Sequence, residues 1–349
     1  MDSDVKALCQ VVLMDGTFAS LTEGQDSSIA RIHALLSTGQ DRVQIHYAPG
    51  QQWAAWRTLP QLVSGQTLDQ NIRSAYGWLS RHWRPGNPLF FFGYSRGGIG
   101  ICALAEMIET VGLLRSDAAS DANIATAWAR YRHGAQAALP SDCCHDHVPI
   151  RMVGLLDTVM SLGIRLPLLW SVTEPGFDYA KGRLAGNVSQ GVHALALDET
   201  RRAFEPILWQ DVESRTEQMW FRGCHADIGG QLGGMEAARP LANLPLVWLL
   251  SRAQEAGLPL PEGWAQAHPC DHEAPPVGSW YKWGKAFLMR GPREAGQNDS
   301  EALHPSVPRP YPGPARLHGK LAHAARVRRP PFSRLRIGNA RGNDPEAAL

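Results

Sequence analysis

Short apolar runs and helical apolar repeats take turns along this chain. Short, mostly apolar segments that predict strands occupy residues 7–14, 43–47, 89–92, 148–156 and 218–221. Apolar residues that recur every three or four positions predict helices over residues 28–36, 71–81, 100–111 and 244–256. Because strands alternate with helices, the pattern predicts an α/β fold with a doubly wound, mostly parallel sheet.

Residues outside this alternation divide into insertions and a C-terminal extension. Residues 115–147 and 160–186 are predicted to be insertions, and residues 260–315, rich in proline, glycine and tryptophan, are predicted to wrap irregularly over the sheet. No acidic residue occurs from 302 through 343, where arginines accumulate. We therefore expect one domain over residues 1–315 and a basic, flexible tail over residues 316–349.

The balance of charge argues against nucleic acid as a partner. The chain of 349 residues has 34 Lys and Arg against 33 Asp and Glu. No apolar run approaches the roughly 18 to 20 residues of a membrane-spanning helix. The acidic first residues lead directly into a strand-like segment, so we expect no Sec-type signal peptide.

Two clusters of Cys and His residues contain the residue types that bind metals. Residues 142–147 read Asp-Cys-Cys-His-Asp-His, and residues 268–272 read His-Pro-Cys-Asp-His. Neither cluster has the ligand spacing of a known zinc site, and no run of acids resembles a calcium loop. We interpret both as polar surface loops and predict no metal or cofactor. The role of Cys143, Cys144, His145 and His147 stays open.

The strongest chemical signal is the pentapeptide Gly-Tyr-Ser-Arg-Gly at residues 93–97, which follows the predicted strand 89–92 and precedes a predicted helix. Strand, Gly-x-Ser-x-Gly and helix together form the setting of a nucleophile elbow. The tight turn would expose the Ser95 hydroxyl near the N-terminus of the helix, where developing negative charge is stabilised. Ser95 is therefore the candidate nucleophile, although the same glycines could serve only to let the helix pack closely on the sheet.

Polar residues that follow the predicted strands supply partners for Ser95. Asp15, Asp157 and His225 each come just after an apolar strand, and parallel sheets collect their chemistry at the carboxyl ends of the strands. A serine hydroxyl needs a base and a carboxylate that orients the base, and α/β-hydrolases carry them in the chain order Ser, Asp, His. We therefore predict a triad of Ser95, Asp157 and His225.

Two other residues are rivals for these roles. Asp227 could replace Asp157 as the acid, although it lies only two residues from His225. His304 could replace His225 as the base, or could contact the substrate. Asp157 and His225 could also be structural, the first as a cap for the next turn and the second as a loop histidine bonded to the backbone.

An oxyanion hole needs two N–H donors beside the nucleophile. The first should be the backbone N–H of Arg96, the residue after Ser95. The second normally comes from an early loop between a strand and a helix, and Gly16 or Thr17 is the candidate. Asp15, at the start of this loop, either takes part in the site or merely caps the loop.

Several separated motifs occur in a fixed order along the chain. They are residues 14–17 (Met-Asp-Gly-Thr), 93–98 (Gly-Tyr-Ser-Arg-Gly-Gly), 154–159 (Gly-Leu-Leu-Asp-Thr-Val), 194–206, which include Leu-Asp-Glu-Thr-Arg-Arg, and 223–230 (Gly-Cys-His-Ala-Asp-Ile-Gly-Gly). Together they resemble the DUF2235 family of α/β-hydrolases, which includes the Tle1-type phospholipase effectors of bacterial type VI secretion. The chain departs from this family at Leu156, where an aromatic residue usually precedes the acid.

The resemblance implies a serine esterase of the phospholipase A type, which hydrolyses acyl ester bonds of glycerophospholipids through Ser95, Asp157 and His225. It further implies an antibacterial effector that is made in the bacterial cytoplasm and delivered by type VI secretion into the periplasm of a target cell. The implied partners are a phospholipid membrane surface, a carrier of the secretion machinery and a cognate immunity protein.

Membrane contact and the alternative functions depend on other residues. The segment from Trp280 to Leu288 mixes aromatic residues with lysines, which suits a lipid headgroup boundary and suits buried packing equally well. One alternative function is an esterase or thioesterase for a soluble substrate. Another is a non-catalytic scaffold with the same fold, which would require the three triad side chains to lie apart.

Overall fold

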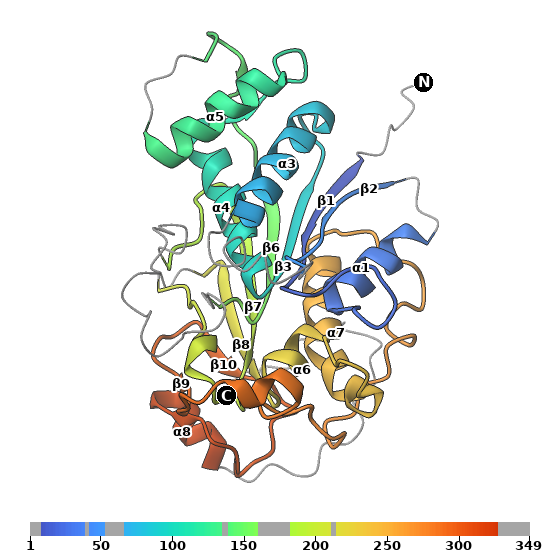
Figure 1. Ribbon diagram of the computed structural model, residues 1–349, viewed down its shortest axis with the longest axis vertical. Helices are drawn as coiled ribbons and strands as arrows, with labels where there is room; N and C mark the ends of the chain where they lie inside the picture. The colour runs from blue at the N-terminus through green and yellow to red at the C-terminus, as the bar shows by residue number, and fades with distance from the viewer. Residues whose placement is uncertain are drawn as a thin grey trace.

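The centre of the molecule is a seven-stranded sheet in which every neighbouring pair of strands is parallel (Figure 1). The computed structural model describes residues 8–38, 42–52, 66–134, 139–159, 182–210 and 214–326. The strands follow the order β10-β8-β7-β6-β3-β1-β2. Their bounds are Cys9–Met14 (β1), Val43–Ala48 (β2), Leu89–Tyr94 (β3), Ile150–Leu156 (β6), Val188–Ala196 (β7), Thr216–Phe221 (β8) and Glu301–Leu303 (β10). The predicted α/β fold with a parallel, doubly wound sheet is confirmed.

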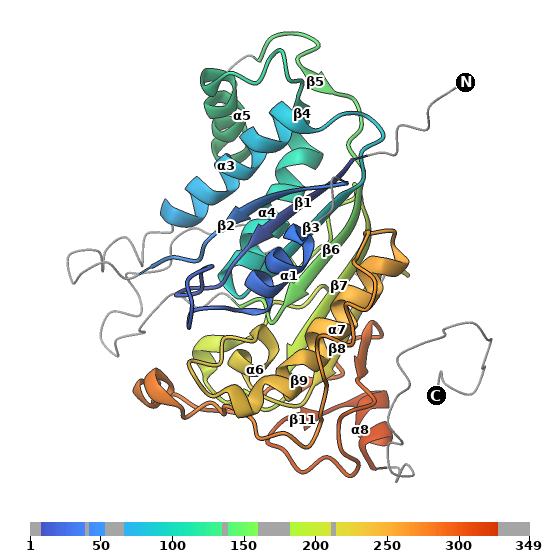
Figure 2. The same ribbon diagram turned by 90° about the vertical axis from the view of Figure 1, so that its right-hand side faces the viewer.

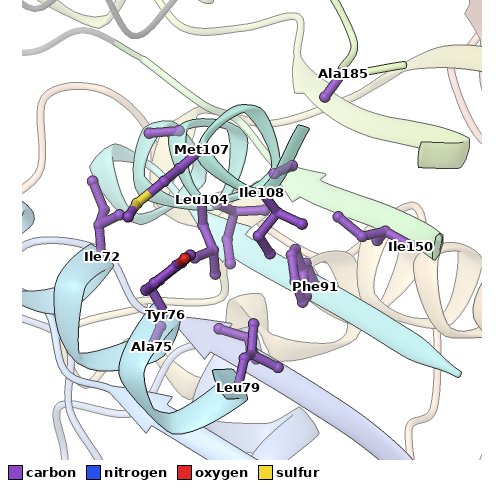
Figure 3. Packing of buried hydrophobic residues seen from close by; sticks show 14 of the residues in the cluster. Ile72, Ala75, Tyr76, Leu79, Phe91, Leu104, Met107, Ile108, Ile150 and Ala185 are labelled. Atoms are coloured by element: carbon purple, nitrogen blue, oxygen red, sulfur yellow. The ribbon is translucent and has the colours of Figure 1, made fainter. Parts of the chain in front are cut away.

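Helices cover both faces of this sheet, so successive strand residues are buried on opposite sides. Helices α3 (Gln66–His82) and α4 (Arg96–Val111) pack on one face, where Phe91 joins their apolar stripes (Figure 3). Helices α1 (Ser28–Ser37) and α7 (Arg239–Glu255) cover the other face, against Phe90 and Phe92. The short helix α6 (His225–Gly229) follows β8 and contacts α7 and β7 (Figure 2).

The sequence pattern missed two strands of the sheet. Strand β7 lies between β6 and β8, but Gly191 and His193 interrupt its apolar run, so no continuous strand signal results. The buried His193 is accommodated because its Nε2 accepts a hydrogen bond from the Thr158 backbone N–H at 3.0 Å. Strand β10 falls in the stretch predicted to be irregular, and it exists because it pairs with β8. That stretch therefore adds a strand to the sheet rather than only covering it.

The predicted insertions and tail are partly within the described residues. Residues 115–147 hold α5 (Asp121–His133), which packs on α3 and α4, and β5 (Cys144–His145), which pairs with β4 (Leu113–Leu114). Most of the insertion 160–186 and residues 327–349 lie outside the described residues. Beyond residue 315 the chain continues into β11 (Arg316–Leu317), which pairs with β9 (Glu294–Ala295), and α8 (Gly319–Arg326). Folded structure thus extends to Arg326, whereas the division into domains stays a prediction.

Two predicted helices begin earlier than their apolar repeats suggested. The helix predicted over 71–81 begins at Gln66, and the one predicted over 244–256 begins at Arg239. Pro240 is compatible with the second start, because a proline in the first turn lacks only an N–H that has no partner within the helix. Within the described ranges, no helix has both the length and the apolar character that a membrane span requires.

The carboxylate of Glu301 anchors β10 and the turn before it. Glu301 is fully buried, and its Oε2 accepts hydrogen bonds from Trp220 Nε1 and from the Gly296 N–H, both at 2.7 Å. Its Oε1 accepts from the N–H groups of Gln297 and Asn298 at 2.8 and 2.9 Å. One side chain therefore satisfies four donors, among them the buried indole N–H of Trp220.

Replacing Glu301 by alanine should destabilise the fold clearly. Each buried donor left without a partner costs about 1–3 kcal/mol, so we expect Glu301→Ala to lower the free energy of unfolding by at least about 3 kcal/mol. Urea denaturation measures this change. The control Glu255→Ala removes an exposed carboxylate paired with Arg252 and should cost less than about 1 kcal/mol. Equal stabilities of the two variants would contradict this role of Glu301.

Candidate active site

Ser95 lies on a sharp turn between β3 and α4 that only small neighbours permit. Its backbone has φ 56° and ψ −127°, a conformation that non-glycine residues rarely adopt. A Cβ atom on Gly97 would come within 2.2 Å of the Met14 carbonyl oxygen, and one on Gly93 within 2.6 Å of the Gly98 Cα. Because α4 begins at Arg96, Ser95 lies at its N-terminal end, where the helix dipole favours negative charge.

Three polar side chains from distant parts of the chain meet at this turn. His225 Nε2 lies 2.9 Å from Ser95 Oγ, and His225 Nδ1 lies 2.6 Å from Asp157 Oδ2. Ser95 follows β3, Asp157 follows β6, and His225 opens α6 after β8. All three are buried. Since the Asp157 carboxylate can only accept, Nδ1 carries the proton and Nε2 is left to accept from the Ser95 hydroxyl.

Asp157 also forms an ion pair that the sequence pattern did not indicate. Arg293 Nη1 lies 2.6 Å from Asp157 Oδ1, and Arg293 Nη2 lies 3.0 Å from Asp157 Oδ2. The Ala196 N–H donates to Oδ1 at 2.9 Å, and Arg293 itself donates to the carbonyl oxygens of Ala196 and Phe204. Arg293 stands in a stretch with several other basic residues, so no local signal distinguished it.

These contacts set the protonation states of the acid and the base. Burial alone would raise the pKa of Asp157, but the Arg293 guanidinium and the hydrogen bond from His225 hold that pKa well below its usual range. Burial lowers the pKa of His225 below its ordinary value, against the opposing effect of Asp157. Asp157 is therefore ionised and His225 is neutral at neutral pH, which are the states that a triad requires.

Aromatic rings pack against the His225 ring, and a second carboxylate binds the His225 backbone. The ring lies 4.9 Å from that of Tyr94 and 4.8 Å, edge to face, from that of Phe204. The His225 backbone N–H donates to Glu199 Oε2 at 3.2 Å, and Glu199 is in turn paired with Arg201. Through these contacts the Asp-Glu-Thr-Arg sequence at residues 198–201 lies beside the site.

The loop after β1 is organised by Asp15. Its Oδ1 accepts from the Gly16 N–H and from Ser27 Oγ, both at 2.7 Å, and its Oδ2 accepts from the Tyr47 hydroxyl at 2.9 Å. Burial raises the pKa of Asp15 to about 6, although these hydrogen bonds favour its ionised form. Thr17, the next residue after Gly16, accepts a hydrogen bond on its Oγ1 from Arg96 Nε at 2.7 Å. Asp15 therefore holds the loop that faces Arg96.

The rival acid and the rival base have other partners. Asp227 accepts from the N–H groups of Cys224 and Val277 at 2.8 and 2.7 Å, so it fixes the turn into α6. His304 stacks on Phe221, with ring centroids 4.4 Å apart, and its Nδ1 accepts from the Ser306 N–H at 3.2 Å. Burial lowers the pKa of His304 to about 3. The structure thus brings His225 and Asp157, rather than these two residues, to Ser95.

The Cys and His cluster lies in a separate part of the molecule, on the β4–β5 pair. The Sγ atoms of Cys143 and Cys144 are 3.6 Å apart, and the His145 ring meets Trp83 edge to face at 4.8 Å. In the described ranges, no three or more His, Cys, Asp or Glu residues are grouped as a metal site needs.

Comparison with known proteins identifies the family. Residues 9–252 match the family model "T6SS, Phospholipase effector Tle1-like, catalytic domain". The chain belongs to this family. The membership predicted from the motifs is thereby confirmed, and the matched residues include Ser95, Asp157 and His225.

Individual relatives are distant. The uncharacterized protein YEL023C of Saccharomyces cerevisiae is 26% identical over 229 residues, which are 56% of this chain and 32% of that protein. The Tle1 effector bound to the VgrG spike of the type VI secretion system is 16% identical, with a TM-score of 0.39 over 64% of this chain and 51% of that one. An uncharacterized protein from Pseudomonas aeruginosa is 18% identical, with a TM-score of 0.45 over 76% and 49%. The chain thus spans about a third to a half of the length of these relatives.

Substitution of Arg293 should change the pH dependence of any reaction that uses His225. Without the guanidinium, the uncompensated charge of Asp157 raises the pKa of His225. In wild type the acid limb of kcat/KM on a soluble ester should fall below pH 6.5, because the pKa of His225 is lowered. In Arg293→Met this limb should move to higher pH, and the free energy of unfolding should drop by about 3–5 kcal/mol.

The conservative variant Arg293→Lys keeps the positive charge and serves as the matched control. Its acid limb should stay close to that of wild type, whereas its stability should fall because the three N–H donors of a lysine cannot replace all four contacts of the guanidinium. If neither variant moves the limb, Arg293 has no influence on the base, and the ion pair is only structural.

Proposed function

We propose that this protein is a serine esterase that cleaves acyl ester bonds of glycerophospholipids, as a phospholipase of the A type. The observation that carries the proposal is the hydrogen-bonded series Ser95, His225 and Asp157 at the N-terminus of α4, in a chain of the Tle1-like family. The scaffold alternative required these side chains to lie apart, and the 2.9 Å between Ser95 Oγ and His225 Nε2 gives it no support.

In the proposed reaction, His225 Nε2 takes the proton of the Ser95 hydroxyl while Ser95 Oγ attacks the carbonyl carbon of the ester. The tetrahedral intermediate collapses by breaking the bond to the lysophospholipid oxygen, which receives the proton from His225. An acyl-enzyme remains. Water, deprotonated by His225, attacks the acyl carbon, and the fatty acid leaves as Ser95 regains its proton. Asp157 stays ionised throughout and stabilises the imidazolium that forms twice.

The negative oxygen of the intermediate needs two donors near the N-terminus of α4. We assign one to the backbone N–H of Arg96, the residue after the nucleophile and the first residue of α4. Of the two candidates in the Asp15 loop, the Gly16 N–H already donates to Asp15. This favours the Thr17 N–H as the second donor, with the Thr17 side chain held by Arg96. Loss of one such donor typically reduces the rate by about 10²–10³-fold.

The biological setting that we propose follows the family. The protein would act as an antibacterial effector, made in the bacterial cytoplasm and delivered by type VI secretion into the periplasm of a target cell. A solved relative, the Tle1 effector, is bound to a VgrG spike, and a spike protein is the carrier we propose here. A cognate immunity protein would protect the producing cell.

Lipid mass spectrometry after incubation with phospholipid vesicles tests the reaction. Wild type should release fatty acid and lysophospholipid, and the retained acyl chain would identify the attacked position. Ser95→Ala should reduce release by at least about 10³-fold, because the nucleophile is lost, while the fold is kept. The matched control Ser37→Ala, at the exposed end of α1, should behave as wild type.

Two results would contradict the proposal. Undiminished fatty acid release by Ser95→Ala would remove Ser95 from the reaction. Hydrolysis of short-chain soluble esters without any release of fatty acid from phospholipid would agree with the proposed triad but would show that the substrate is a soluble ester.

A further inference from the structure

Large apolar side chains are exposed in only two segments of the described chain. They are Phe18 and Leu21 in the loop after β1, and Trp280, Leu288 and Met289 around the 3₁₀-helix η4 (Lys282–Ala286). Leu288 is 80% exposed and Trp280 is 58% exposed. Isolated exposed apolar residues are ordinary, but their confinement to two segments indicates a binding surface.

Both segments border the same turn, residues 230–234, directly after the helix that carries His225. On one side, Gln231 Nε2 donates to the Thr17 carbonyl oxygen at 3.1 Å, next to Phe18. On the other side, the Tyr281 hydroxyl and Lys282 Nζ donate to the Gly233 carbonyl oxygen. The exposed apolar residues therefore flank the region of Ser95 and His225, and the η4 segment, orange in Figure 2, lies far from α5 in both views.

Contacts made by Arg290 and Phe287 hold this segment in its exposed position. The Arg290 guanidinium stacks on the Trp280 ring at 3.7 Å and donates to Thr200 Oγ1 at 3.1 Å and to the Phe287 carbonyl oxygen at 2.8 Å. The Phe287 ring meets Phe204 edge to face at 5.2 Å, and Phe204 contacts the His225 ring. The exposed side chains of Trp280, Leu288 and Met289 thus belong to a segment that these contacts hold in place beside the site.

The charge of the segment indicates what it meets. Residues 274–293 contain no acidic residue, while Lys282 and Lys285 are exposed in the same segment as the exposed apolar side chains. Exposed Trp, Leu and Met side chains flanked by lysines match the boundary between acyl chains and anionic headgroups. We propose that residues 18–21 and 280–289 form the surface by which this protein docks on an anionic phospholipid bilayer. The surface brings Ser95 and His225 to the lipid. This inference rests on the proposed phospholipase function.

Vesicle binding in the Ser95→Ala background tests docking without hydrolysis. Full-length protein should bind vesicles that contain phosphatidylglycerol more tightly than vesicles of phosphatidylcholine alone. The double substitution Leu288→Glu with Met289→Glu should weaken binding at least tenfold, and Lys285→Gln should reduce the preference for the anionic lipid. The matched control Ala122→Glu with Ala125→Glu places the same two charges on exposed alanines of α5 and should leave binding unchanged.

Kinetics of variants that retain Ser95 distinguish a role of this segment in docking from a role in supporting the catalytic residues. The Leu288→Glu, Met289→Glu variant should hydrolyse a short-chain soluble ester within about twofold of wild type, yet release at least tenfold less fatty acid from vesicles. Equal loss on both substrates would overturn the proposal, because the segment would then support the catalytic residues. Unchanged vesicle binding, with binding to a spike carrier lost instead, would also overturn it and assign the surface to a protein.

The docking proposal can fail separately from the proposed reaction. If wild type binds anionic vesicles through these residues but releases no fatty acid, docking stands and the phospholipase proposal fails. If fatty acid is released while the substitutions leave binding and release unchanged, the reaction stands and the docking surface is refuted.

Discussion

The buried carboxylate of Asp157 accepts hydrogen bonds from four N–H groups, one from His225, two from Arg293 and one from the backbone of Ala196. A charge removed from water is tolerated only when such partners surround it. These partners come from α6, from the segment before β9 and from the end of β7. The sheet and the C-terminal region must therefore both be folded for the carboxylate to orient His225.

This dependence gives the irregular C-terminal stretch a direct part in the site. Arg293 fixes Asp157 from one side, while Arg290 braces the segment that carries Trp280 and Leu288. The Phe204 ring links the two, because it contacts both His225 and Phe287. A stretch that the sequence predicted only to wrap over the sheet therefore positions the Asp157 carboxylate, and in our proposal it also contacts the lipid.

The parts of the site that depend on local sequence were predictable. The turn at Ser95 needs glycine at 93 and 97, and apolar strand runs placed Asp157 and His225 at the carboxyl edge of the sheet. The remaining parts depend on contacts between distant residues. Strand β7 was missed because His193 is buried through a hydrogen bond to Thr158, and Arg293 was missed because its partner lies 136 positions earlier. Sequence also left Asp227 and His304 as rivals, since only the fold shows that their hydrogen bonds lie elsewhere.

Covalent labelling of the nucleophile tests the central claim, that Ser95 is activated by His225 and Asp157. A fluorophosphonate ester reacts with an activated serine by losing fluoride and leaving a phosphonyl group on Oγ. Intact-protein and peptide mass spectrometry should find one adduct, located on Ser95. It should be absent from Ser95→Ala and should form at least about 10³-fold more slowly in His225→Ala, because the base is lost. Labelling of a different serine, or equally fast labelling of Ser95 without His225, would contradict the account.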